Sequence, residues 1–252
     1  MKKEFENEPV LLIGVNSGNP KRAVEAYLTS VKSEWPAYVD ADHSFEKAFG
    51  FEISLNNIFQ ARTVDLNGNV ESVNPGDLPA AIKNLLRTAK WKIPPAEIPE
   101  PLKKAWRALE FGQSTVAAPL IKQALSASDP KVKEAAKKLA DVVVAEITKT
   151  LADGKTKADA GQKWEAYKLY SSVTENFKDF AEAKPATAEV AKLRSDAKVA
   201  REIQAKTMLT KANELLASPK KTENQQGQMG LQAIAAQYAD TEAGAQAKAL
   251  SK

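Results

Sequence analysis

The apolar run Val10-Leu11-Leu12-Ile13-Gly14-Val15 decides the class of the first third of the chain. A short, continuously apolar run of this kind is typical of a strand that is buried on both faces of a parallel sheet. The turn Asn16-Ser17-Gly18-Asn19 follows it, and Pro20 suits the first position of a helix. The sequence therefore predicts that this region begins with a β-α unit.

The alternation of strand and helix patterns continues up to residue 90. Further strands are expected over Ala37–Val39, Ala61–Val64 and Val70–Val73, with further helices over Ser44–Phe49 and Asp77–Lys90. Asp65-Leu66-Asn67-Gly68 separates the last two strands, and Asn-Gly favours the positive φ angles of a type I′ hairpin turn. The order β-α-β-α-β-β-α predicts an α/β domain with a mixed sheet covered by helices.

A proline-rich segment divides the chain. Four prolines lie between Pro94 and Pro101, and because no helix or central strand accommodates them, we expect a stiff linker over residues 93–101. Nine of the 13 prolines lie in residues 1–101, whereas residues 102–252 hold 32 alanines. The sequence therefore predicts an α/β domain over 1–92, the linker, and an all-α domain over 102–252.

Helical periodicity runs through almost all of residues 102–252. Val132, Ala136, Leu139, Val143, Ile147 and Leu151 form one amphipathic stripe, and Trp164, Tyr167, Tyr170, Val173, Phe177 and Phe180 form another. Asp129-Pro130 has the residue types of a helix N-cap and first helical position. The string Val173-x-x-x-Phe177-x-Asp179 is echoed by Ile234-x-x-x-Tyr238-x-Asp240, which predicts stacked helical hairpins rather than a strict repeat.

Composition excludes several classes of protein. The absence of Cys excludes disulfides and thiolate sites, and the single His43 excludes a His-rich metal site. The net charge is only +4, with Lys and Glu interleaved, which argues against a nucleic-acid partner. No apolar run approaches the ~18 residues of a membrane span, and residues 1–8 lack the apolar part of a signal peptide. We therefore predict no catalytic, cofactor-binding or metal-binding residues and no cofactor; the compartment stays open.

Four strings together resemble the thioredoxin-like redoxin family over roughly residues 8–90. They are Val10 to Asn16, Trp35 to Asp42, Phe49-Gly50 and Thr63 to Val70. The region 100–252 resembles the tetratricopeptide-type helical domains that bacteria attach to such modules, ending in Tyr238-x-Asp240-Thr241-Glu242-Ala243. The resemblance implies a Cys-x-x-Cys motif and a cis-proline, and both are missing. The cis-proline position falls near Phe59, where we expect an ordinary trans loop.

The resemblance also places the family's central strand upstream of Met1. One explanation is that the chain is a shortened version of a longer protein, whose relatives are often exported. The other is that Val10–Val15 has taken the central place, which would put Ser17-Gly18-Asn19-Pro20 where the cysteines belong. We favour the first, because a sheet without its central strand has unpaired edges in the core.

Six residues are candidates for binding a protein or peptide partner: Asn56, Asn57, Phe59, Trp164, Tyr167 and Tyr170. The first three border the loop that, by the resemblance, touches substrate peptides. The three aromatic residues could line a peptide groove, although their helical spacing favours a seam between helices. His43, close to Asp40 and Asp42, could shuttle protons or bind a metal, but a loop residue beside a helix cap is favoured.

The leading hypothesis is a redox-inactive thioredoxin-like protein whose helical scaffold domain mediates protein–protein interaction. The alternative is an N-terminally truncated thiol–disulfide oxidoreductase whose cysteines lie upstream of Met1. A nucleic-acid-binding helical protein ranks last, because the net charge is modest.

Overall fold

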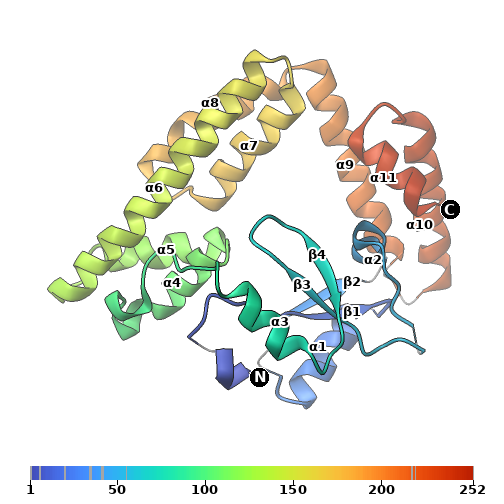
Figure 1. Cartoon of the computed structure of the whole chain (residues 1–252). Coiled ribbons are helices and arrows are strands. Elements are labelled where there is room, and N and C mark those ends of the chain that lie inside the picture. The colour runs from blue at the N-terminus through green and yellow to red at the C-terminus, as the bar shows by residue number, and fades with distance from the viewer. Residues whose placement is uncertain are drawn as a thin grey trace. The chain divides into compact units, whose positions relative to one another are not determined.

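The computed structural model of the chain places short strands near the N-terminus and helices over most of the remainder (Figure 1). The structure describes residues 2–5, 7–19, 21–33, 36–40, 43–54, 56–216, 218 and 220–251. Residues 91–202 form one compact unit, and residues 1–90 together with 203–252 form another. The chain is mostly helical, as expected for residues beyond 102, while the predicted domain boundaries stay predictions.

The first 90 residues follow the predicted order β-α-β-α-β-β-α after a short 3-10 helix, η1 (Lys2–Phe5). The elements are β1 (Gly14–Ser17), α1 (Lys21–Ser30), β2 (Ala37–Asp40), α2 (Ser44–Phe49), β3 (Ala61–Val64), β4 (Val70–Val73) and α3 (Leu78–Leu85). The type and order of these elements match the prediction, and the last helix is shorter than expected at both ends.

The four strands form two separate sheets, which corrects the single mixed sheet expected from the sequence. β1 pairs with β2 in parallel, and β3 pairs with β4 in antiparallel orientation, with no ladder between the two pairs in the described residues. Residues 51–54 and 56–60, which lie between the two pairs in sequence, hydrogen-bond with one another. There, Asn57 N–H donates to Ser54 O (3.0 Å), and the Gln60 amide donates to Glu52 O (2.5 Å). Because these groups satisfy one another locally, they are not presented to a neighbouring strand.

The first strand also differs from its prediction. It begins only at Gly14, and Ile13 is exposed, so the expectation of a strand from Val10 that is buried on both faces was wrong. Gly14 N–H donates to Pro36 O (2.9 Å), at the point where the partner strand begins. Pro36 has no N–H to return, so the ladder cannot extend further toward the N-terminus.

The hairpin between β3 and β4 is present, but its turn is not of type I′. Of the turn residues only Gly68 has a positive φ (83°), whereas a type I′ turn also needs one at Asn67. The Asp65 carboxylate accepts hydrogen bonds from the backbone N–H groups of Asn67 and Asn69, both at 2.8 Å. This side-chain turn fixes the loop, and Gly68 N–H donates to Asp65 O (3.1 Å).

Helices in sequence order pack against their neighbours in residues 91–202. The elements are η2 (Pro95–Glu97), η3 (Glu100–Leu102), α4 (Lys103–Glu110), α5 (Ser114–Ala124), α6 (Pro130–Asp159), α7 (Lys163–Asn176), η4 (Ala181–Ala183) and α8 (Lys184–Arg194). α6 contacts both α5 and α7, and α7 contacts α8. The predicted N-cap of α6 is confirmed, since the Asp129 carboxylate accepts the N–H of Lys131 at 2.8 Å.

The proline-rich segment is packed onto the helices of this unit. Ile93 and Ile98 are buried, and the indole N–H of Trp106 donates to Ile93 O at 3.0 Å. The Glu110 carboxylate accepts the backbone N–H groups of Lys92 and Ile93, both at 2.9 Å. The segment is therefore an ordered part of the helical unit.

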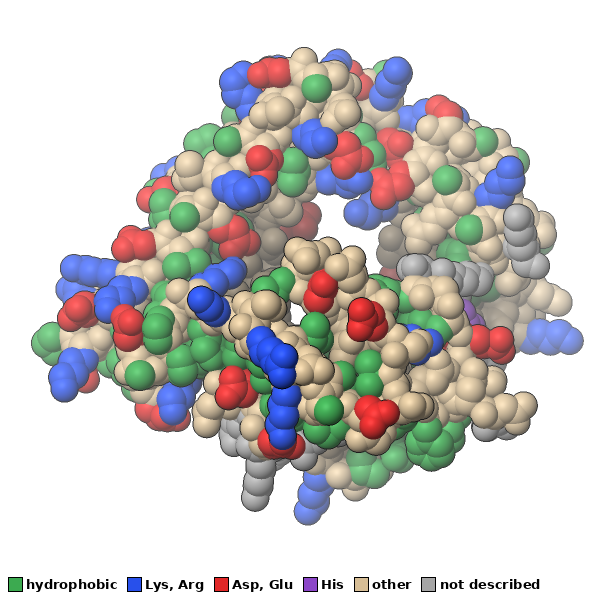
Figure 2. Space-filling model, viewed as in Figure 1, with side chains coloured by type: hydrophobic (Ala, Val, Ile, Leu, Met, Phe, Trp, Pro, Cys, Tyr) green, Lys and Arg blue, Asp and Glu red, His purple; other side chains and the backbone are tan. Residues whose placement is uncertain are grey.

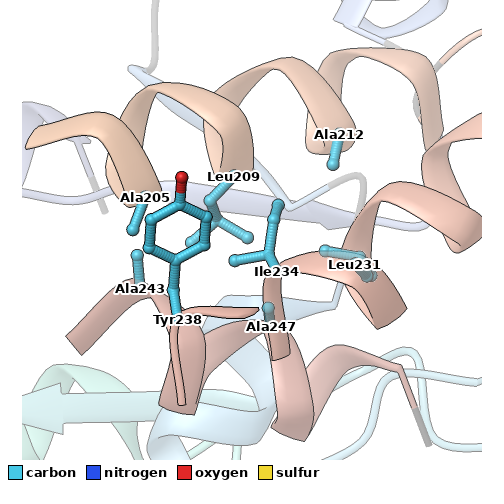
Figure 3. Packing of buried hydrophobic residues seen from close by; sticks show 8 residues of the cluster. All are labelled: Ala205, Leu209, Ala212, Leu231, Ile234, Tyr238, Ala243 and Ala247. Carbon is cyan, nitrogen blue, oxygen red and sulfur yellow. The ribbon is translucent and has the colours of Figure 1, made fainter. Parts of the chain in front are cut away.

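The last helices are α9 (Ala197–Leu216), α10 (Lys221–Gln237) and α11 (Glu242–Leu250). They enclose a hydrophobic cluster of Ala205, Leu209, Ala212, Leu231, Ile234, Tyr238, Ala243 and Ala247 (Figure 3). α9 and α10 approach closely because Gly227 has no side chain: a Cβ there would lie 2.9 Å from Ala212 O. Small residues thus set the spacing of these helices.

The two strings that echo each other in the sequence end their helices in the same way. Phe177 N–H donates to Val173 O (3.0 Å), and Tyr238 N–H donates to Ile234 O (2.9 Å). All four side chains are buried. In both places the backbone carbonyl of the aromatic residue accepts the N–H of the residue three positions later in the chain. That residue lies just before the next helical segment. The echo therefore corresponds to a shared local structure.

Candidate interaction surface

Exposed apolar side chains concentrate in the strand-containing region. Of the twelve large hydrophobic side chains exposed in the described residues, ten lie between Leu11 and Leu66. The other two are Val116 and Met229, on α5 and α10. Single exposed apolar residues are ordinary, whereas large contiguous apolar patches are typical of interaction sites.

The loop before β3 carries the most exposed of these side chains. Phe59 is 83% exposed, and its neighbour Ile58 is also exposed. Asn57 shapes the loop, since its Oδ1 accepts the Ser54 N–H (2.6 Å) and its Nδ2 donates to Glu52 O (2.9 Å). The peptide bonds from residue 56 to residue 60 are trans.

Asn56 and Asn57 are both exposed, so the three candidates expected from this loop lie at the surface together. The amide groups of Asn57 are already engaged within the loop. Phe59 is therefore the member of this set whose side chain has the most surface to offer a partner.

The aromatic candidates on α7 lie in a seam between helices. Tyr167 and Tyr170 are buried, and Trp164 stacks on Tyr167 with ring centroids 5.4 Å apart. The Tyr170 ring lies against Gly154 of α6, where a Cβ would come within 2.9 Å of it, and burial raises the pKa of its hydroxyl. Tyr167 OH accepts a hydrogen bond from Arg194 Nε (3.2 Å). These contacts fix the packing of α6, α7 and α8.

A polar cluster that the sequence did not indicate lies at the carboxyl ends of β1 and β2. Ser17 Oγ is 3.0 Å from His43 Nδ1, and Glu46 Oε2 is 3.2 Å from the same nitrogen. Gly18 lies against the imidazole, since a Cβ there would be 3.2 Å from His43 Nε2. In sequence, Ser17 is 26 residues from His43 and 29 residues from Glu46. The parallel pairing of β1 with β2 brings these residues together.

The chemistry of this cluster is that of a structural anchor. In a catalytic triad the serine and the carboxylate contact different nitrogens of the imidazole, whereas both contact Nδ1 here. Asp40 is buried, and its carboxylate accepts the N–H groups of Phe45 (2.9 Å) and Glu46 (3.0 Å) at the start of α2. Asp42 lies outside the described residues. In the described part of the chain, no group of three His, Cys, Asp or Glu side chains could hold a metal ion.

The Glu46 carboxylate gives a pH-dependent prediction. Burial raises its pKa, but hydrogen bonds from Ser17 and His43, with the charge of His43, outweigh burial and lower the pKa below its ordinary value of 4.5. The ionised form therefore contributes stability above pH 4.5, and this contribution is lost as the pH falls through the lowered pKa. We expect Glu46→Gln to cost about 1–3 kcal/mol at pH 7 and clearly less at pH 3. Urea unfolding followed by circular dichroism at both pH values measures this; an equal cost at both would contradict it.

Charges on the helices are mixed. On the face shown in Figure 2, basic and acidic side chains are intermixed over the helical part of the chain. Several are paired, such as Lys149 with Asp153 (2.5 Å) and Lys155 with Asp159 (2.7 Å). A hollow of about 380 Å³ beside η2 is lined by two lysines and two glutamates, of which Lys138 and Glu97 pair at 2.7 Å. None of the helices in the described ranges has the length and apolar character to cross a membrane.

Comparisons with known proteins give no relative from which a function could be transferred. No protein-family model matches the chain, and neither the curated proteins nor the solved structures include a significant match. The residues of this chain therefore carry the functional argument.

Proposed function

We propose that this protein is a non-catalytic scaffold that binds other proteins. It would combine a thioredoxin-like domain that lacks redox cysteines with a tetratricopeptide-like domain of helical hairpins. The observation that carries the proposal is the concentration of ten exposed hydrophobic side chains between Leu11 and Leu66. An apolar surface of this kind costs solubility unless a partner covers it.

The thioredoxin-like part of the proposal is supported by the order of elements in residues 1–90 and by the hairpin at Asp65–Gly68. The chain has no Cys, so its own residues cannot carry out thiol–disulfide exchange. The only histidine shares one ring nitrogen between Ser17 and Glu46, which suits anchoring rather than proton transfer to a substrate.

The helical part of the proposal is supported by the shared helix ends at Phe177 and Tyr238. It is also supported by the packing of successive helices from α4 to α8 and of α10 on α11. Helical hairpins that stack in this way build extended surfaces, which many scaffold proteins use to hold partners. Hydrophobic burial drives most protein association, so the exposed apolar side chains of residues 11–66 are the expected contact points.

The proposal is tested by affinity capture from the native cells with three forms of the full chain. These are the natural sequence, Phe59→Ser, and Met229→Ser as a matched control, because Met229 is 61% exposed on α10. We expect a specific set of proteins to be retained by the natural sequence and by Met229→Ser, and to be reduced at least tenfold by Phe59→Ser. A bound aromatic side chain can account for that loss, since it contributes about 1.5–3 kcal/mol.

Two results would contradict the proposal. One is that no protein is retained above the background of an unrelated helical protein. The other is that all three forms retain the same proteins to the same extent, which would remove the apolar loop from the binding surface. Circular dichroism of each form checks that Phe59→Ser is folded.

A further inference from the structure

Four aromatic side chains from β2, α2 and the segment that follows α2 form a cluster centred on Phe45. The ring centroids of Tyr38 and Phe45 are 5.0 Å apart, those of Phe45 and Phe49 are 4.4 Å apart, and those of Phe45 and Phe51 are 5.8 Å apart. Two members of the cluster reach the surface, since Tyr38 is 46% and Phe49 is 40% exposed. Both of these rings contact the Phe45 ring, so the cluster presents apolar area to solvent.

An arginine lies against the Phe51 ring of this cluster. The Arg62 guanidinium lies 5.0 Å from the centroid of the Phe51 ring. It donates one hydrogen bond to Ser72 Oγ and another to Gln60 Oε1 (3.0 Å), and both acceptors are neutral. No ion pair within the described ranges includes Arg62. These contacts hold the guanidinium in place, and no carboxylate in the described part of the chain pairs with it.

Along the chain, the neighbours of Arg62 include an exposed apolar side chain and several acidic residues. Val64 lies two residues further along β3, on the same face of the strand, and it is exposed. Arg62 is the only Lys or Arg between Lys47 and Lys83, a stretch that also contains Glu52, Asp65, Glu71 and Asp77. One carboxylate suits this one fixed guanidinium, because the two groups pair through parallel N–H···O hydrogen bonds in a planar geometry.

We infer that this surface, formed by Tyr38, Phe49, Phe51, Arg62 and Val64, binds a protein segment that combines bulky apolar side chains with one carboxylate seated on Arg62. The inference rests on the proposed protein-binding function and adds the chemistry of the partner. The apolar side chains of the partner segment cover the aromatic cluster, and its carboxylate pairs with the Arg62 guanidinium. A guanidinium has five N–H donors in a planar fork, so it retains donors that can engage a carboxylate.

The test begins with a display library of random peptides selected against the full chain, against Arg62→Gln, and against Arg22→Gln. Arg22 is exposed on α1, so its replacement removes the same charge elsewhere. We expect the natural sequence and Arg22→Gln to select peptides with large apolar residues and an Asp or Glu. Arg62→Gln should lose this acidic preference, and matching circular dichroism spectra check that all three chains are folded.

A double-mutant cycle on one selected peptide then isolates the contact. Changing its acidic residue to the amide should weaken binding to the natural chain about 10- to 100-fold, as expected for a charged hydrogen-bonded pair. The same peptide change should have little effect on binding to Arg62→Gln. Isothermal titration calorimetry measures the four affinities.

The inference is overturned if the two changes act independently, or if the selected peptides are apolar without an acidic residue and bind Arg62→Gln equally well. In that case protein binding itself still stands, and only the chemistry of the partner is wrong. The inference also fails if no peptide is enriched, or if the surface is covered by a second copy of the chain, seen as self-association that Arg62→Gln does not change. Affinity capture with Phe59→Ser decides the broader function separately.

Discussion

Gly244→Ala is expected to destabilise the hairpin of α10 and α11 by about 3 kcal/mol, the upper range for forcing extra volume into a packed site. A Cβ at Gly244 would lie only 1.8 Å from Tyr238 O. That carbonyl is held in place, because it accepts the Thr241 N–H (2.9 Å) and the Thr241 hydroxyl (2.7 Å). Since Thr241 Oγ1 in turn accepts the Gly244 N–H (2.9 Å), the clash would break the cap of α11.

Urea unfolding followed by circular dichroism measures the loss, and Gly76→Ala is the matched control. Gly76 is exposed, and a Cβ there meets nothing within 4 Å. The control should change the free energy of unfolding by less than about 0.5 kcal/mol, as surface changes usually do. A similar result for both variants would mean that Tyr238 O does not lie where the structure places it.

Leu139→Ala is expected to cost about 2–5 kcal/mol, the range for truncating a fully buried leucine. Leu139 lies in the first half of α6 and is 0% exposed. Because α6 packs against both α5 and α7, the cavity would open in the centre of the helical unit. The loss should appear as a lower midpoint of urea unfolding.

The control for Leu139→Ala is Val116→Ala, which also shortens an apolar side chain on a helix. Val116 is exposed on α5, so its replacement opens no cavity and should cost less than about 1 kcal/mol. If Leu139→Ala cost no more than Val116→Ala, α6 would not have its stripe of apolar residues in the core.

Local patterns were enough to predict most elements of this chain. The stripe from Val132 to Ile147 predicted the long helix α6, and Asp129 predicted its start, because capping depends only on the first few residues of a helix. The strands β3 and β4 were predicted with the bounds that the structure has. In each case the decisive interactions join residues that are close in sequence.

The candidate site was predicted only in part. Phe59 lies at the surface as the partner hypothesis requires, but Tyr167 and Tyr170 are buried in a helical seam. The same spacing of aromatic residues describes a groove and a seam, and only the packing of α7 against α6 and α8 separates them. The contact between the Arg62 guanidinium and the Phe51 ring was not predicted, because the two residues are 11 positions apart and no local pattern links them.

The sequence by itself determined the order of strands and helices, the absence of thiol chemistry and the position of the hairpin. Tertiary structure alone decided that the strands pair as two sheets, that Ser17 and Glu46 share one nitrogen of His43, and that Arg62 lies against the Phe51 ring. The physical reason is the separation along the chain over which each kind of interaction acts. Helical and turn preferences act over a few residues, whereas strand pairing and side-chain clusters depend on partners that long-range packing brings together.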